Sequence, residues 1–422
     1  MHAYRALKND KDNALAREVI GEKMVDGVWK VVREVPDIDE EETKVMAAAR
    51  RSIGKDYDLF AKLALKKSVA LAKRLEDVGF HDLAGLYWWH AILYDSSNEE
   101  ALKARGYVEV DEVWVPSLAQ DNLQRGMRFL KDASNGRPDQ TEDEQPGKVG
   151  LTFTRRASNG LVVRTTFDTE RAKRFVEVAN ATATFTTGLL DMKGKSFRSN
   201  PYILTVVGKR IDFTKMINNF EPQSAKRGQI AREATGHSTT NPVGYIVVET
   251  KTEITTDDML SNVVASEILL NSRESAVSPW LLVGFPYYVT SCVLNTAITS
   301  RFEIKDGSKT RVYRGDRDKI KRGNPFAPED FRLIIRDLVE SKQDTPLLDL
   351  ALLELNDFNE YHAAKAFAFV EFLFLAHTAK AKAWLRTSDQ KGHKEIKALA
   401  KRFEKSVEEL EAEFRAWVLK NY

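Results

Sequence analysis

Cysteine is almost absent from this sequence of 422 residues, which contains only Cys292. A single cysteine excludes an intramolecular disulfide framework. A nucleophilic cysteine would need a histidine nearby in space. We therefore interpret Cys292 as a small buried side chain without a chemical role.

Long hydrophobic runs are also missing, and no stretch of about 18 apolar residues is present to form a transmembrane helix. The first residues, MHAYRALKNDKDNALARE, lack the apolar region of a signal peptide. As the chain stands we expect a cytoplasmic protein, whereas a start further upstream would leave room for an export signal.

An excess of either charge is missing too, since 64 Lys and Arg face 62 Asp and Glu, a formal net charge of +2. No long basic stripe is evident, and we expect no nucleic-acid partner. Residues 301–323 hold nine basic and four acidic residues. Such a run could bind an anionic partner, but a solvated loop is the commoner outcome.

Familiar catalytic motifs are absent. None of the seven histidines has another at i+4, and there is no phosphate-binding glycine loop and no Gly-x-Ser-x-Gly turn. His90 lies on the apolar side of an expected helix, which favours a core or interface histidine over a metal ligand.

The composition that remains, 43% hydrophobic and 30% charged, is typical of a soluble globular protein of two or three domains. We expect four segments: a charged one (1–55), a helical module with a short hairpin (56–130), a polar linker (131–148) and a second domain (149–422). Within the module, NEEALKARGY (98–107) resembles a tetratricopeptide-type repeat, and a plain helical bundle is the alternative.

The second domain has an α+β pattern, a small mixed sheet followed by helices. A hairpin is expected around Ser158-Asn159-Gly160 because Asn-Gly favours tight turns between strands. Long helices are expected at 357–385 and 393–420, the latter with a capping box of Ser406 and Glu409.

A helix within residues 255–270 is expected to be deeply buried, because apolar residues lie on nearly all of its sides. Thr255 or Thr256 is the expected N-cap. Glu267 is the only charge in the middle of this helix. A buried carboxylate needs a cation or hydrogen-bond donors, or else it stays protonated.

This helix and the later Pro279-Trp280-Leu281 resemble the gluzincin peptidases (peptidase MA superfamily), in particular a bacterial branch with His-Glu-x-x-His-Leu-Leu on the helix. With Leu269-Leu270 and Trp280 aligned, the first zinc ligand corresponds to Val263 and the general base to Val264. The other two ligands correspond to Glu267 and Val283. Shifting the alignment by three residues still supplies no histidine, so we expect no zinc cofactor.

The resemblance covers roughly residues 75–422, because the hairpin-and-helix segment 152–182 and the closing helix 406–422 are also similar to that branch. It implies an inactive peptidase-like domain that binds a protein or peptide partner, with the strand within 242–252 beside the cleft. The candidate cleft residues are Glu267, His237, Trp280, Tyr287 and Tyr288.

Two other functions remain open. One is a hydrolase with a relocated or metal-independent site around Glu267 and His237, which requires both side chains to face one cleft. The other is a structural subunit of a larger assembly, docked through the helices of residues 57–105. Exposed side chains of Leu83, Tyr87 and Trp88 would favour this function.

Overall fold

A computed structural model of the chain contains two compact units, residues 1–64 and 65–422. The structure describes residues 22–25, 28–31, 40–95, 97–111, 113–141, 148–220, 228, 234–240, 242–249, 252–273, 277–299, 328–387 and 391–422. The basic run 301–323 therefore lies outside the described residues. Among the described helices, none is both long and apolar enough to span a lipid bilayer.

The first unit holds an antiparallel hairpin and most of a long helix. The hairpin consists of β1 (Glu22–Val25) and β2 (Val28–Val31), and the helix is α3 (Glu40–Asp77). Helix α3 continues across residue 64, so the expected boundary at residues 55–56 and the boundary between the two units both lie inside this helix.

The second unit begins with the end of α3, from residue 65. The other elements of the helical module are α4 (His81–Tyr94), α5 (Glu99–Ala104), β3 (Tyr107–Val110), β4 (Val113–Pro116) and α6 (Gln120–Lys131). The expected hairpin is confirmed as the antiparallel pair of β3 and β4. Trp88, Trp89 and Ile92 are buried in one cluster with Leu333 from the carboxyl half of the chain. The module therefore packs into the same compact unit as the second domain.

The expected linker at 131–148 is partly ordered structure. Strand β5 (Arg137–Pro138) pairs with β6 (Thr154–Ser158), and Arg155 forms an ion pair with Asp139 at 2.8 Å. Lys131 ends α6 and residues 137–138 belong to the sheet, so the described part of the expected linker, 131–141, lies within one compact unit. Residues 142–147 lie outside the described residues.

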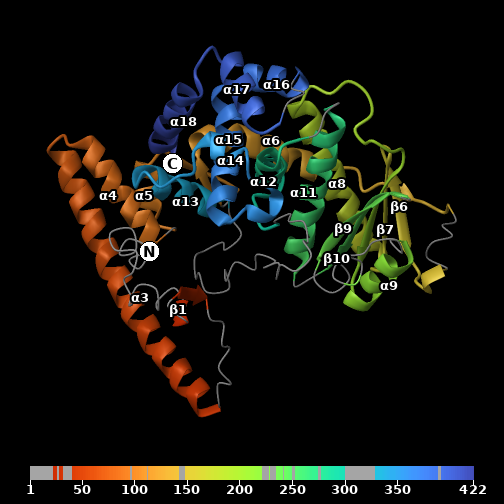
Figure 1. Ribbon diagram of the computed structural model, residues 1–422, viewed down its shortest axis with the longest axis horizontal. Coiled ribbons are helices and arrows are strands. Elements are labelled where there is room, and N and C mark those ends of the chain that lie inside the picture. The colour runs from red at the N-terminus through yellow and green to blue at the C-terminus, as the bar shows by residue number, and fades with distance from the viewer. Residues whose placement is uncertain are drawn as a thin grey trace. The chain divides into compact units, whose positions relative to one another are not determined.

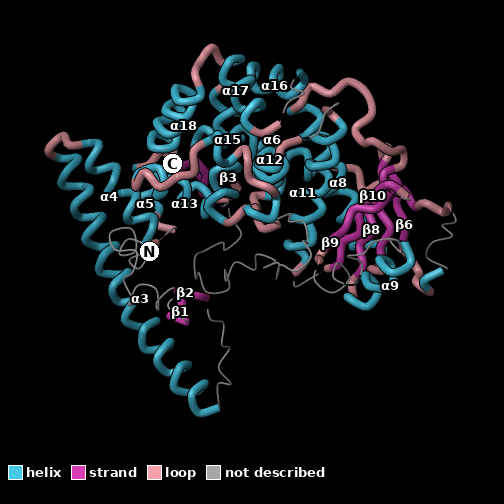
Figure 2. The backbone as a smooth tube through the Cα atoms, in the orientation of Figure 1, coloured by secondary structure: helices cyan, strands magenta, loops and turns pink. Residues whose placement is uncertain are grey.

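A mixed six-stranded sheet forms one side of this unit, in the order β5-β6-β7-β8-β10-β9 (Figures 1 and 2). Its remaining strands are β7 (Leu161–Thr165), β8 (Tyr202–Val207), β9 (Gly236–Thr240) and β10 (Val243–Val248). The expected hairpin around Asn159-Gly160 is confirmed, and both residues have the positive φ of such turns. Strands β7, β8 and β10 are parallel, and β9 pairs antiparallel with β10 at the edge.

Helices cover both faces of the sheet. Helices α8 (Thr169–Leu189) and α11 (Glu253–Asn271) share a core with Leu204, Val206 and Val247, and they lie between the sheet and the carboxyl-terminal helices of this unit (Figure 1). On the other face, α9 (Arg210–Phe220) packs on Ile246 and Val248.

The rest of the unit is helical and confirms the α+β class. It consists of α12 (Pro279–Leu294), α13 (Glu329–Glu340), α14 (Leu347–Leu350), α15 (Glu360–Ala376), α16 (Thr378–Thr387), α17 (His393–Arg402) and α18 (Val407–Asn421). The two long helices expected here are each divided in two. The capping box of Ser406 and Glu409 is confirmed, and it begins α18 after the left-handed Glu404 ends the preceding turn.

Candidate functional site

The helix that resembles the peptidase helix, α11, is buried on nearly all sides as the sequence predicts. Its N-cap is Thr252, whose side chain accepts a hydrogen bond from the Thr255 amide at 3.4 Å. The cap expected at Thr255 or Thr256 is wrong, because both residues lie within the first turns of the helix.

Three residues correspond in the alignment to the first zinc ligand, the general base and the third zinc ligand of the peptidases, and all three are core residues. Val263, Val264 and Val283 all lie in the main hydrophobic core. Aliphatic side chains have no lone pairs to donate to a metal and cannot accept a proton. These three positions therefore contribute packing and no chemistry.

Glu267 has a specific partner. Both of its oxygens accept hydrogen bonds from Arg198, at 2.6 Å from Nε and 2.7 Å from the second guanidinium nitrogen. Glu267 is buried, whereas the Arg198 side chain is 52% exposed. The hydrogen bond to Glu267 raises the pKa of Arg198. The buried carboxylate of Glu267 thus has the cationic partner that it requires, and this partner, Arg198, lies in the loop that precedes β8.

Changing Arg198 to alanine should lower the free energy of unfolding by about 1–2 kcal/mol, because it leaves a buried carboxylate without its donors while solvent screens the half-exposed pair. Urea unfolding at neutral pH measures this loss. The double variant Arg198→Ala/Glu267→Met should recover most of the lost stability, since it also removes the carboxylate. An unchanged stability of Arg198→Ala would contradict the role given to this ion pair.

The aromatic residues expected beside a cleft are core residues instead. Trp280 is fully buried, stacks on Trp384 with ring centres 6.1 Å apart, and donates from its indole nitrogen to Glu395 at 3.0 Å. Tyr287 is buried with its ring edge against Phe331. The prediction that Trp280 and Tyr287 line a cleft is therefore wrong.

Tyr288 lies at a small pocket between the module and the carboxyl-terminal helices. Its hydroxyl accepts a hydrogen bond from Asn122 at 2.9 Å, and Cys292, Arg332 and Glu371 are among the other lining residues. Burial raises the pKa of the Cys292 thiol to about 12, so this cysteine is not a thiolate at neutral pH. Cys292 therefore does not supply this pocket with an activated nucleophile.

His237 and Glu267 lie on opposite faces of the sheet. His237 on β9 is directly opposite Ile246, whose side chain packs on the α9 face. Cross-strand neighbours point to the same face. Glu267 belongs to α11, on the other face. The structure does not bring together the two residues that a relocated hydrolase site requires.

The main chain of β9 has one side turned away from the sheet. The Val248 amide donates to the Thr235 carbonyl at 2.9 Å. Hydrogen-bonded and non-hydrogen-bonded pairs alternate in an antiparallel ladder, so His237 bonds to β10 in the same way. The N–H and C=O groups of Gly236, Ser238 and Thr240 therefore point outward. No strand within the described residues pairs with this side.

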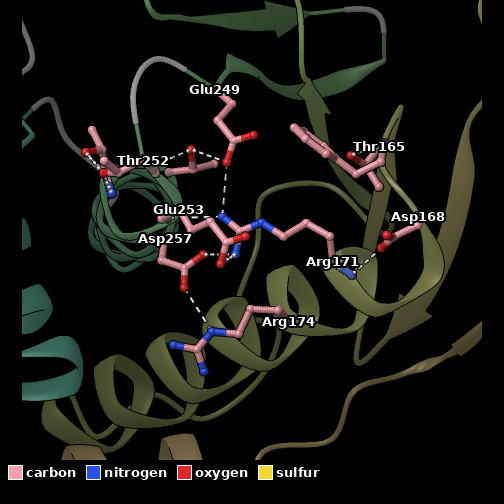
Figure 3. A network of polar contacts seen from close by, with 11 residues as sticks. Thr165, Asp168, Arg171, Arg174, Glu249, Thr252, Glu253 and Asp257 are labelled. Carbon is pink, nitrogen blue, oxygen red and sulfur yellow. Dashed lines mark hydrogen bonds and ion pairs between the residues drawn. The ribbon is translucent and has the colours of Figure 1, made fainter.

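An ion-pair network that the sequence did not reveal fixes the neighbouring ends of β10, α8 and α11 (Figure 3). The guanidinium of Arg171 lies 3.3 Å from Glu249, 3.2 Å from Asp257 and 3.6 Å from Glu253. Arg174 completes the network at 2.9 Å from Asp257, and burial raises the pKa of that carboxyl. The pairs connect the end of β10 to α8 and α11.

The region holds no recognisable metal centre among the residues that the structure describes, since no group of three or more His, Cys, Asp or Glu could hold an ion. Comparison with models of known families, with curated proteins and with solved structures finds no match. The gluzincin resemblance stays a prediction.

Proposed function

We propose that this protein is a catalytically inactive, gluzincin-like protein that binds an extended segment of a protein or peptide partner along β9. The partner would add a strand to the sheet and form main-chain hydrogen bonds with Gly236, Ser238 and Thr240. Hydrolysis is not part of the proposal, because Val263 and Val264 supply neither a ligand nor a base.

The observation that carries the proposal is the contrast between the two edges of the sheet. Natural sheets protect their edges with charged residues, proline or very short strands. At one edge, β5 has only two residues, Arg137 and Pro138, and so has all three protections. At the other, β9 reads GHSTT and contains no Lys, Arg, Asp, Glu or Pro. An unprotected edge of this kind is suited to accepting a strand.

The anchoring of β9 and β10 at this end of the sheet supports the same function. Strand addition loses less affinity when the acceptor strand is already ordered. β9 is held by β10, and Glu249 at the end of β10 is tied to Arg171. The acceptor edge is thus supported by elements that need not rearrange on binding.

A proline at position 238 tests the proposal. Ser238→Pro removes an outward N–H and leaves the bonds of β9 to β10 in place. We expect affinity for a peptide selected from a random displayed library to fall at least about tenfold. Titration calorimetry measures the affinity, and mass spectrometry should recover the peptide uncleaved.

The matched control is Ser238→Ala, which keeps the N–H and should bind the same peptide as the unchanged protein does. Equal binding by the proline and alanine variants would rule out strand addition at β9. Cleavage of the bound peptide would contradict the inactive state.

A further inference from the structure

Positive charge is concentrated in two segments, 301–323 and 378–405, and the second, which is largely described by the structure, holds nine Lys and Arg but three Asp and Glu. Since the whole chain has a net charge of +2 and this segment +6, the remaining residues have a net charge of −4. Of the three acids, Glu395 is buried in an ion pair with Arg273, Glu404 lies 3.6 Å from Lys380, and Asp389 is outside the described residues. The balanced total charge thus conceals a segregated distribution.

Five exposed cations form what we call the α17 stripe: Lys391, Lys394, Lys397, Lys401 and Arg402. Spacings of three and four residues place Lys394, Lys397 and Lys401 on one side of the helix. The opposite side, with Ile396 and Leu399, is buried in the core. The stripe is therefore the solvent face of a helix whose orientation is fixed by packing.

The charges of the stripe interact unfavourably with the dipole of their own helix and with one another. Lys391 and Lys394 lie at the amino end, where the helix dipole disfavours cations, and only Lys401 and Arg402 lie at the favourable end. Like charges three and four residues apart also repel. Among the described residues, no acidic side chain forms an ion pair with any member of the stripe. A local conflict of this kind is expected at functional sites.

We propose that the α17 stripe binds the phosphate backbone of nucleic acid without reading its sequence. Lysine and arginine neutralise phosphates and release their counterions. A protein partner fits poorly, because protein interfaces are depleted in lysine and enriched in aromatic residues, and the described part of α16 and α17 exposes no large apolar side chain. Insertion into a membrane also fits poorly, because the apolar side of α17 is already buried.

The test measures how binding of the full chain to a fluorescently labelled DNA duplex of mixed sequence depends on salt. If all five cations contact phosphates, the logarithm of the association constant should fall against the logarithm of salt concentration with a slope of about −4.5. The variant Lys394→Gln/Lys397→Gln/Lys401→Gln should reduce this slope by about 3 and weaken binding at least about tenfold at ~0.1 M salt. Its melting temperature should be unchanged or higher, since the repulsion is removed.

The matched control, Lys131→Gln/Lys193→Gln/Lys195→Gln, removes the same charge from exposed positions outside the stripe and should leave the slope unchanged. An equal loss of duplex affinity in both variants would show that binding depends only on the net charge of the protein, and it would overturn the proposal. No duplex binding at ~0.05 M salt would also overturn it. So would stripe-dependent binding of polyglutamate or of phosphatidylserine vesicles without binding of the duplex.

Discussion

Changing Arg273 to methionine is expected to lower the free energy of unfolding by about 3–5 kcal/mol. The side chains of Arg273 and Glu395 are both fully buried, and the guanidinium lies 2.9 Å from the carboxylate. Removing the cation leaves a buried charge whose remaining hydrogen bond comes from the Trp280 indole. Urea unfolding followed by tryptophan fluorescence measures the loss.

The control is the double variant Arg273→Met/Glu395→Gln, which removes both charges and keeps an acceptor for Trp280. It should recover at least half of the lost stability, because the main cost is the unpaired charge and not the loss of the pair. A single variant that costs less than about 1 kcal/mol would show that the pair is hydrated and would contradict the packing described for Trp280.

The second large effect is expected for Gly284→Ala, which adds a methyl group and should lower the free energy of unfolding by about 2–3 kcal/mol. Helices α12 and α15 cross so closely here that a Cβ would meet the carbonyl group of Ala366. A backbone atom cannot turn aside as a flexible side chain can, so one of the helices must move.

The matched control is Gly188→Ala on α8, where an added Cβ meets no atom within 4 Å. Alanine favours a helix over glycine, so this variant should be as stable as the unchanged protein or more stable by up to about 1 kcal/mol. Thermal unfolding compares the two. If Gly284→Ala is tolerated equally well, the close helix crossing is wrong.

These two sites bear on the meaning of the peptidase resemblance. Trp280 belongs to the Pro279-Trp280-Leu281 segment on which the resemblance depends, Gly284 follows it within α12, and both have a structural reason to be there. Trp280 fills the core beside Glu395, and Gly284 permits the crossing of α12 with α15. Both residues are therefore explained by packing alone, which is compatible with the proposed inactive function.

Local signals in the sequence predicted local structure well. The Asn159-Gly160 turn, the short hairpin of the helical module and the Ser406–Glu409 capping box each depend on residues a few positions apart, and each is confirmed. The burial of α11 was also predictable, because apolar residues on all sides leave such a helix no face for solvent.

Features that depend on distant residues were not predictable in the same way. The partner of Glu267 is Arg198, 69 residues earlier in a loop, and nothing in the local pattern singles it out. The face on which His237 lies depends on the register of β9 with β10. The burial of Trp280 could not be predicted from its neighbours in the sequence, because the residues that cover it belong to α16 and α17. The α17 stripe is not visible in the net charge or as a long basic run, because its cations alternate with buried residues along the helix.

Amide hydrogen exchange, measured by NMR with and without a selected peptide, tests strand addition at β9 most directly. The amides of Gly236, Ser238 and Thr240 point outward and should become protected when the peptide binds. Those of His237 and Thr239 already bond to β10 and should change little. Protection of the three outward amides is the predicted result. Unchanged exchange at all three while the peptide is bound would contradict the proposed function.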